Sequence, residues 1–237
     1  MELVLEPEKS GEEIKRCISQ FGYTPEHNYS YFLTNAEFGA KNIFLRSNKG
    51  YGVLAAYREK AAEVTMISEA LAPRGEQVEV LHDALDTCFS KLSIQKFVVE
   101  QDDVLMKKML KEFANNGYRA LPPRYSLYWP LFDMEKWDGN DMHGEDWKKL
   151  RNIRNRFYNE HSVEVVNSKS VDKEQLKKIV HDWVERRKLM GLGANRKDSN
   201  LAYSERYINM IELGFEGTKF AKTMVVDGEP CTVTAGW

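Results

Sequence analysis

A predicted three-stranded antiparallel meander is the feature that most restricts the folds open to this chain. Two apolar runs, 42–46 (NIFLR) and 52–58 (GVLAAYR), flank the segment 47–50 (SNKG). That segment favours a tight turn, because Asn and Gly tolerate positive φ. A third run, 61–67 (AAEVTMI), follows after a two-residue connection. We therefore expect three strands that pair in chain order.

Helical and strand patterns continue on both sides of this meander up to residue 132. Apolar residues recur at helical spacing in one segment before the meander and in two segments after it. Helices are predicted at 11–22 and 102–117, and the segment 71–92 is predicted to turn into a helix with Val78, Leu81 and Leu85 on one side. A strand is expected at 94–101, and another, interrupted by two prolines, at 118–132. The predicted order is one helix, three strands, and then helix, strand, helix and strand.

A similar alternation starts again after the segment 133–146, which is rich in glycine and acidic residues. Helices are predicted at 147–161, 172–190 and 204–213, with a strand at 163–168 and a terminal hairpin, 219–237, turning on Asp227-Gly228. The inward face of the second of these helices is predicted to carry Leu176, Ile179, Val180 and Trp183.

We therefore expect an α/β (α+β) protein with mixed, mostly antiparallel sheets in two domains. The predicted domains are 1–135 and 144–237, with the boundary in the glycine-rich segment between them. The chain stops at the end of a predicted strand, which is an unusual place for a terminus. The second domain is therefore expected to be incomplete.

The composition restricts the class of protein. The 34 Lys and Arg residues nearly balance the 36 Asp and Glu residues, and the net charge of −2 argues against non-specific coating of nucleic acid. Three widely separated cysteines suggest neither a disulfide framework nor a metal site, and they favour a reduced, cytoplasmic setting. No signal peptide is expected, and no apolar run approaches the roughly 18 residues of a membrane span.

The element order in residues 1–132 resembles that of GNAT-type acyltransferases. The resemblance implies an Arg-Gly-x-Gly turn after the third strand, where backbone N–H groups and a helix N-terminus hold a pyrophosphate. Arg74 and Gly75 match this turn, but Gln77 stands in place of the second glycine. A side chain at that position would crowd a phosphate. Arg74 and Gly75 are thus candidate cofactor contacts in a degraded loop, and a plain turn into a helix is the alternative.

The stretch 125–166 resembles the phosphatidylglycerol lysyltransferase C-terminal-domain-like family of tandem GNAT proteins. In that family, a Tyr-x-Tyr strand leads to a basic helix of the type Arg-Asn-x-x-Arg-Phe. The hairpin at 227–237 also resembles the central hairpin of a second GNAT domain. The matching residues of the strand and helix are Tyr125, Tyr128, Lys148, Lys149, Arg151, Asn152, Arg154, Asn155, Arg156 and Phe157.

This resemblance implies an acyl or aminoacyl transferase. The donor would be a coenzyme A thioester or an aminoacyl-tRNA, held between the two domains. The acceptor would be an amine or a hydroxyl group, such as a membrane lipid headgroup. The donor-binding loop of the second domain would lie beyond Trp237.

The basic helix 147–160 allows two interpretations. Its charged residues spread around most of the helical wheel, as expected of a solvated or domain-bridging face. Alternatively, Lys148, Arg151 and Arg154 contact phosphates of RNA or of a lipid. Arg196 and Lys197, in the basic loop that follows the next helix, are further candidate substrate contacts.

No acid–base set with a defined spacing is evident. The histidines His82, His143, His161 and His181 have no such partners and are predicted to be structural or surface residues. GNAT chemistry depends mainly on positioning, so this absence counts little against a transferase. Tyr128 and Glu100, near strand ends, are candidate general acid–base groups.

Two rival functions remain open on the sequence alone. The degraded loop around Gln77 favours a non-catalytic binding module that uses a GNAT fold to recognise a ligand. The basic helix would also suit an RNA-binding accessory protein.

Overall fold

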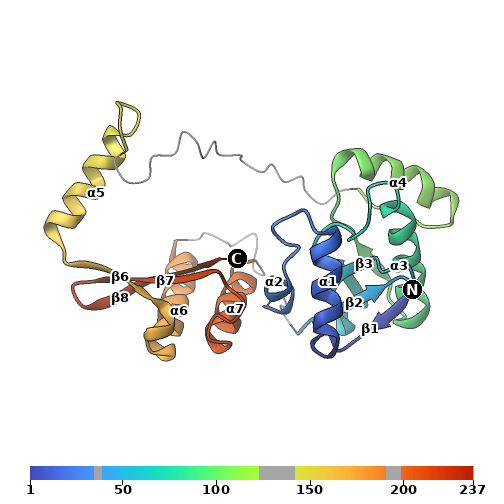
Figure 1. Cartoon of the computed structure of the whole chain (residues 1–237), viewed down its shortest axis with the longest axis horizontal. Helices are drawn as coiled ribbons and strands as arrows, with labels where there is room; N and C mark the ends of the chain where they lie inside the picture. The colour runs from blue at the N-terminus through green and yellow to red at the C-terminus, as the bar shows by residue number, and fades with distance from the viewer. Residues whose placement is uncertain (35–38, 123–141, 191–198, 237) are drawn as a thin grey trace.

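The computed structural model describes residues 1–34, 39–122, 142–190 and 199–236. We call residues 1–122 the first lobe and residues 142–236 the second lobe. Each lobe contains its own β-sheet. Figure 1 shows the two lobes side by side.

The first lobe contains a five-stranded sheet in the order β1-β2-β3-β4-β5. The first four strands pair antiparallel, and β5 then pairs parallel to β4. The expected meander is therefore confirmed as β2, β3 and β4. The strands are β1 (Glu2–Val4), β2 (Lys41–Arg46), β3 (Gly52–Arg58), β4 (Glu63–Met66) and β5 (Lys96–Val98).

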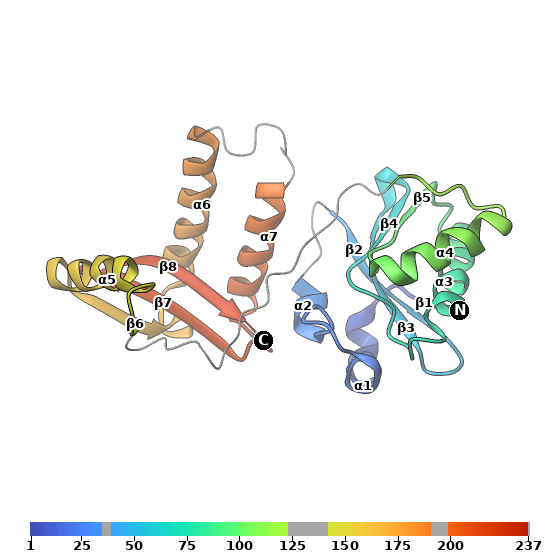
Figure 2. The same cartoon turned by 90° about the horizontal axis from the view of Figure 1, so that it is seen from above.

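Helices cover both faces of this sheet (Figure 2). Alternation along the strands sends Ile43 and Leu45 towards α3 and α4, while Phe44 faces α1 and α2. Each face thus has its own apolar core. The helices are α1 (Gly11–Phe21), α2 (Tyr29–Thr34), α3 (Gln77–Lys91) and α4 (Asp103–Asn115), with short 3₁₀ turns η1 (Pro7–Ser10) and η2 (Glu59–Ala61).

The second lobe contains a three-stranded antiparallel sheet, β6-β7-β8. Helices α6 and α7 pack together and cover one face of this sheet, with Leu176, Ile211 and Ala221 in their common core (Figure 2). Val165 is 60% exposed and Phe220 is 47% exposed. The elements are α5 (Lys148–Glu160), β6 (Val163–Asn167), η3 (Ser168–Ser170), α6 (Lys173–Leu189), α7 (Ser199–Glu212), β7 (Phe220–Val226) and β8 (Glu229–Gly236).

The hairpin β7–β8 turns at the predicted position. Asp227 and Gly228 both have positive φ, 51° and 86°, as a two-residue turn between twisted strands requires. The Asp227 carboxylate also accepts a hydrogen bond from the Ser162 backbone N–H, at 2.9 Å. This contact joins the hairpin to the start of β6.

The two lobes meet where α2 packs against α7. The Arg206 guanidinium lies 4.8 Å from the centre of the Tyr31 ring, a cation–π contact. Gly217, just beyond α7, approaches Ser30 so closely that an added Cβ would lie 1.6 Å from the Ser30 hydroxyl. The lobe contact thus depends on a small residue at position 217.

The mixed α/β class expected from the sequence is confirmed, and the assignment of both lobes to the GNAT type stays a prediction. The sequence analysis missed β1 and α2, and Tyr118 to Pro122 form no strand. Trp183 was predicted to be buried, but it is 41% exposed. The proposed boundary around 136–143 falls largely outside the described residues. Among the helices described, none is long and apolar enough to cross a membrane.

Candidate functional site

The loop before α3 contains Arg74 and Gly75, the two candidate cofactor contacts. Arg74 is exposed, and its Nη1 donates a hydrogen bond to the Asp102 carboxylate at 3.0 Å. Asp102 in turn caps α4 by accepting from two backbone N–H groups. A Cβ added at Gly75 would meet nothing within 4 Å. No neighbouring atom within the described structure therefore requires a glycine at position 75.

Gln77 occupies the position where the pyrophosphate turn would need its second glycine. Its side chain is completely buried, and Nε2 donates to the Ala70 carbonyl at 3.1 Å and to the Tyr23 hydroxyl at 2.9 Å. The Gln77 side chain thus fills the loop and is held there by two hydrogen bonds, in agreement with the crowding inferred from the sequence.

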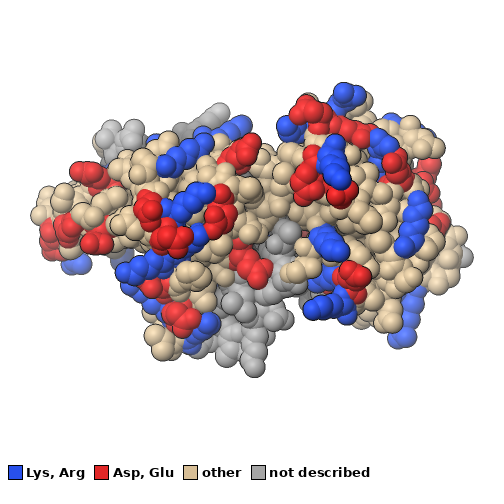
Figure 3. All heavy atoms as spheres, turned by 90° about the horizontal axis from the view of Figure 1, so that it is seen from below, with Lys and Arg blue, Asp and Glu red and all other residues tan. Residues whose placement is uncertain are grey.

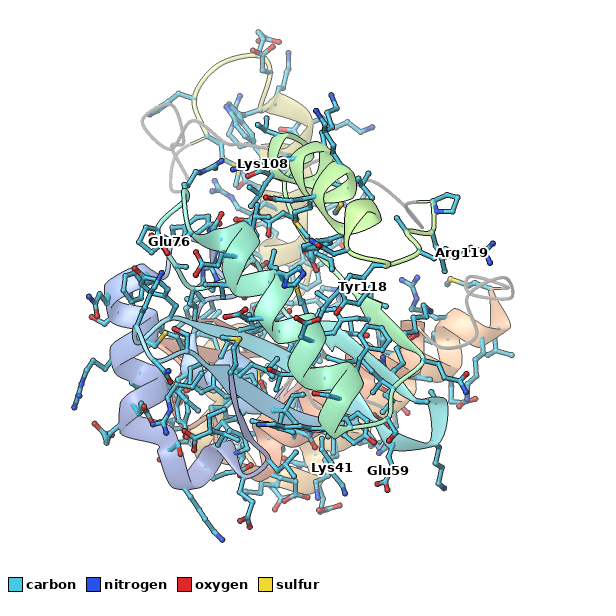
Figure 4. All side chains as sticks on the ribbon, turned by 90° about the vertical axis from the view of Figure 1, so that its right-hand side faces the viewer. Lys41, Glu59, Glu76, Lys108, Tyr118 and Arg119 are labelled. Carbon is cyan, nitrogen blue, oxygen red and sulfur yellow. The ribbon has the colours of Figure 1, made fainter. Side chains whose placement is uncertain are left out.

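Carboxylates surround the N-terminus of α3, where an anion would bind. Glu76 precedes the helix (Figure 4), and Glu79 lies in its first turn. Lys49 bridges the two, at 2.8 and 3.3 Å. With Gln77 filling the loop and Arg74 held by Asp102, these residues do not fit the pyrophosphate of coenzyme A.

A set of carboxylates that sequence reasoning largely missed lies beside this loop. We call Glu26, Glu69 and Glu100 the acidic cluster. Burial raises the pKa of Glu69, the Asp102 carboxylate raises it further, and Arg74 lowers it. Loss of water around its carboxyl also raises the pKa of Glu100, and the Glu26 and Glu69 charges add to this effect. Sequence reasoning had noted only Glu100.

His27 holds the loop that carries Glu26. The His27 side chain is buried, and burial lowers its pKa. Nδ1 accepts from the backbone N–H groups of Tyr23 and Thr24, at 3.0 and 3.1 Å, and Nε2 lies 2.9 Å from the Glu69 carbonyl oxygen. The Tyr23 hydroxyl also bonds the Glu69 carboxylate. A neutral imidazole thus joins the α1–α2 loop to the segment after β4.

Helix α5 carries the candidate phosphate contacts. Lys148 lies 3.3 Å from Glu145, and Arg151 donates to the Gly144 carbonyl at 3.2 Å. Arg154 bonds its neighbour Asn155 at 3.3 Å. The helix has no buried residue, and even Leu150 is 44% exposed. Both the basic and the apolar side chains of α5 are therefore accessible.

The structure does not bring the predicted site residues together. Arg74 and Gly75 belong to the first lobe, whereas α5 lies at the end of the second lobe farthest from it (Figures 1 and 2). This position also separates α5 from the contact between the lobes. The donor was expected between the two domains, and α5 does not lie there. Arg196, Lys197, Tyr125 and Tyr128 lie outside the described residues.

Charge is mixed on the molecular surface. Figure 3 shows basic and acidic side chains interspersed on one face of both lobes. The ion pairs within helices include Lys188 with Glu185 at 2.7 Å, both of them exposed. Such exposed pairs contribute little to stability.

Two further histidines, His82 and His161, have local structural contacts. His161 Nδ1 lies 2.7 Å from the Asp227 carboxylate, beside the β7–β8 turn. This hydrogen bond is the first cause of a lowered pKa for Asp227. His82 lies 3.3 Å from Asp86, one turn further along α3. Across the described ranges, no group of three His, Cys, Asp or Glu side chains could hold a metal ion.

Comparison with known proteins places the fold. No protein-family model and no curated protein matches the chain by sequence. Among solved structures, the chain is similar to L-PGS (lysyl-phosphatidylglycerol synthase) from Bacillus licheniformis, with 16% identity and a TM-score of 0.54. The match covers 99% of this chain and 63% of that chain. The chain therefore has a fold related to that protein and spans 63% of its length.

Proposed function

We propose that this protein is an acyl or aminoacyl transferase that uses an amine or hydroxyl acceptor, such as a lipid headgroup. The observation that carries this proposal is the similarity to L-PGS, which runs through both lobes and 99% of the chain. The proposal includes the division into two GNAT-like domains, 1–135 and 144–237. It also includes a cytoplasmic location.

Aminoacyl-tRNA is the favoured donor over a coenzyme A thioester. The first-lobe loop is filled by Gln77 and flanked by Glu76 and Glu79, which disfavours a pyrophosphate there. The exposed basic residues of α5 suit the phosphates of an RNA acceptor stem. Arg196 and Lys197 are proposed as additional contacts.

The transfer needs positioning more than a strong base. The acceptor nitrogen or oxygen attacks the carbonyl carbon of the aminoacyl ester, and a new amide or ester bond forms. The bond from that carbon to the ribose oxygen of the tRNA breaks, and the acceptor proton passes to the ribose oxygen. Holding donor and acceptor at contact distance supplies much of the rate enhancement for such a reaction.

The proposal is tested by following labelled groups from donor to acceptor. The protein is incubated with radiolabelled aminoacyl-tRNAs or acyl-CoA, together with vesicles containing phosphatidylglycerol or with a soluble alkylamine. We expect label in the lipid or amine fraction with aminoacyl-tRNA. No transfer from either donor class to either acceptor would overturn the proposal.

Charge reversal on α5 tests how the donor is bound. We expect Lys148→Glu with Arg154→Glu to weaken tRNA binding roughly tenfold and to lower its salt slope by about two units, one for each phosphate contact. The matched control reverses Lys107 and Lys108, which are both exposed on α4; Figure 4 labels Lys108. Equal losses of tRNA binding from both pairs of substitutions would contradict a specific role for α5.

A different outcome would favour an RNA-binding accessory protein: tRNA binding that depends on α5, without any transfer of the aminoacyl group.

A non-catalytic binding module is the second candidate function. The observation that favours it is Gln77, whose buried amide closes the first-lobe loop with two hydrogen bonds. A thermal-shift measurement with coenzyme A and with aminoacyl-tRNA distinguishes the two functions. Stabilisation by a donor supports the transferase, and stabilisation by neither donor supports the binding module.

A further inference from the structure

Helix α5 exposes an apolar stripe to solvent. Leu150, Ile153 and Phe157 follow one another at intervals of three and four residues, so they lie along one side of the helix. Leu150 is 44% exposed and Ile153 is 52% exposed. Phe157 is partly buried, and its ring centre lies 5.0 Å from that of His161. We call these three residues the apolar stripe of α5. Figure 1 shows α5 projecting away from the sheet of the second lobe.

Basic side chains line both edges of the apolar stripe. On one edge, Lys149 and Arg156 lie four and three residues from Ile153, a spacing that makes each of them its neighbour on the helix surface. On the other edge, Arg154 lies at the same spacings from the two remaining stripe residues. The helix has five basic residues and one acidic residue, Glu160. The apolar stripe thus lies between two positively charged edges.

The edge that contains Lys149 and Arg156 is only weakly neutralised within the protein. Arg156 lies 3.9 Å from Glu160, and both side chains are exposed, so this pair contributes little in water. Lys149 is exposed and has no ion pair with any residue that the structure describes. This edge also contains none of the proposed tRNA contacts. It is therefore available to a different partner.

A partner for this surface has to accept apolar and positively charged side chains together. A second copy of α5 would bring basic edges close to each other, and like charges in contact are unfavourable. RNA phosphates would pair with the cations but would leave the apolar stripe in water. A bilayer that contains anionic lipids offers both kinds of partner, because its headgroup phosphates attract the basic edges and its acyl chains accept the stripe.

We propose that α5 binds the surface of a membrane rich in anionic lipids and lies in the plane of that surface. The apolar stripe enters the boundary between the headgroups and the acyl chains. Lys149 and Arg156 extend their long side chains along this boundary, which keeps their charges at the level of the phosphates. A helix of 13 residues is shorter than the roughly 20 that span a bilayer, so α5 lies on the membrane rather than across it.

This inference goes beyond the proposed function and does not depend on it. Transfer to a soluble amine needs no membrane, and a protein can bind a membrane without transferring any group. Membrane binding is measured without tRNA, and its variants change residues that are not proposed tRNA contacts. Absence of membrane binding would leave transfer to the soluble alkylamine intact, and absence of transfer would leave membrane binding intact.

The test is co-sedimentation of the whole protein with sucrose-loaded vesicles. One set of vesicles contains phosphatidylglycerol and phosphatidylcholine in equal amounts, and the other contains phosphatidylcholine alone. We expect saturable binding to the anionic vesicles that is at least about tenfold tighter than binding to the neutral ones. The reason is that each basic side chain near an anionic surface contributes about fivefold to the affinity.

Two pairs of substitutions change the stripe and one basic edge separately. Leu150→Gln with Ile153→Gln removes apolar area, and Lys149→Gln with Arg156→Gln removes two positive charges. Each pair should weaken binding to the anionic vesicles at least about tenfold. Glutamine is a good helix former, and α5 has no buried residue, so both variants should fold. Far-UV circular dichroism confirms that each variant is folded.

The matched controls make the same kinds of change on α4 of the first lobe. Val104 is 77% exposed and Leu110 is 39% exposed. Lys107 and Lys108 are exposed on the same helix. Val104→Gln with Leu110→Gln, and Lys107→Gln with Lys108→Gln, should bind both sets of vesicles as the unaltered protein does.

A fluorescent label shows whether the stripe enters the bilayer. The environment-sensitive dye NBD is attached at Ile153→Cys, in a protein whose exposed cysteine has been removed by Cys231→Ser; the other two cysteines are buried. We expect the emission to shift to the blue on binding anionic vesicles. The same dye at Asn159→Cys should show no such shift, because Asn159 lies two residues from Phe157 and therefore on the opposite side of the helix.

Several results would overturn the proposal. One is no binding to the anionic vesicles, or equal binding to the neutral ones. Another is equal weakening by the α4 controls, which would remove any specific role of α5. A third is binding that depends on Lys149 and Arg156 but not on Leu150 and Ile153, without a blue shift, because the stripe would then stay outside the bilayer. The last is dimerisation in sedimentation velocity that Leu150→Gln with Ile153→Gln abolishes, which would assign the stripe to a second copy of the chain.

Discussion

Glu100 illustrates how one side chain in the first lobe responds to its neighbours. Its carboxyl loses water and faces the charges of Glu26 and Glu69, and all three effects raise its pKa. A carboxyl whose pKa is raised by folding binds its proton more tightly in the folded state. Its ionisation therefore opposes folding, and this cost grows as the pH rises from 4.5, the ordinary pKa of the group, up to the raised folded-state pKa, above which it is constant.

At the residue scale, we expect Glu100→Gln to stabilise the protein at pH 7. The amide keeps the shape of the side chain and removes the unfavourable charge. Although its carboxyl is partly desolvated, Glu100 as a whole residue is exposed. Solvent therefore screens much of the repulsion, and we expect a rise in Tm of only about 1–2 °C. The gain should disappear as the pH falls below 4.5, the ordinary pKa of the group, where Glu100 is protonated in both states.

The measurement is thermal unfolding of both proteins between pH 3 and pH 8. Glu59→Gln is the control, because it removes an exposed carboxylate that is paired with Lys41 and should give no gain at pH 7. A Tm for Glu100→Gln that equals that of the unaltered protein at every pH would contradict the repulsion within the acidic cluster.

At the scale of elements, the sequence predicted the helices and strands that have a long periodic pattern of apolar residues or a characteristic turn sequence. The 13-residue helix α5 and the β7–β8 hairpin with its Asp-Gly turn lie where expected. β1, with three residues, and α2, with six, were missed because they are too short to show a period. Both depend on tertiary packing, and Phe32 of α2 is completely buried.

The acidic cluster could not be predicted from the sequence, for a different reason. Its three carboxylates come from loops that are distant in the chain, at positions 26, 69 and 100. No local spacing relates them, and only the parallel pairing of β4 and β5 brings two of these loops together. By contrast, Gln77 could be interpreted from the sequence, because its conflict with a phosphate turn is local.

At the same scale, two Leu→Ala substitutions compare an open helix with a packed one. Leu150 of α5 is 44% exposed, and Leu176 of α6 is 1% exposed. We expect Leu150→Ala to change the free energy of unfolding by no more than about 0.5 kcal/mol, and Leu176→Ala to lower it by about 2–5 kcal/mol. Both are in helices, so the change in helix propensity largely cancels.

Urea unfolding of the two variants provides the comparison. A Leu150→Ala cost similar to that of Leu176→Ala would mean that the apolar side of α5 is covered in solution. That result would contradict an accessible α5 and would remove the structural support for its contact with RNA.

At the scale of the whole molecule, the contact between α2 and α7 links two lobes that have separate sheets and separate cores. The short α2 contributes to the first-lobe core through Phe32 and to the lobe contact through Tyr31 and Ser30. Displacement of α2 should therefore affect both the packing of the first lobe and its contact with the second.

Gly217→Ala tests this contact. Gly217 has a φ of 74°, and its new Cβ would lie 1.6 Å from the Ser30 hydroxyl oxygen and 2.7 Å from the Ser30 Cβ. We expect a loss of about 1–3 kcal/mol in the free energy of unfolding, from backbone strain together with the displacement of α2. Gly228→Ala is the matched control, because it has a φ of 86° with nothing within 4 Å.

The clash and the strain are separated by a double-mutant cycle with Ser30→Gly. Removing the Ser30 side chain makes room for the new Cβ but leaves the strain at residue 217, so the cycle should show a favourable coupling of about 1 kcal/mol or more. Ser30→Gly combined with Gly228→Ala should show none, because that glycine has no neighbour to displace. Equal costs for the two glycine substitutions and no coupling in the cycle would mean that the lobes do not meet at Gly217 in solution. A measured coupling would instead show that α2 contacts the loop after α7. Backbone strain at residue 217 is independent of the Ser30 side chain and therefore cannot produce such a coupling.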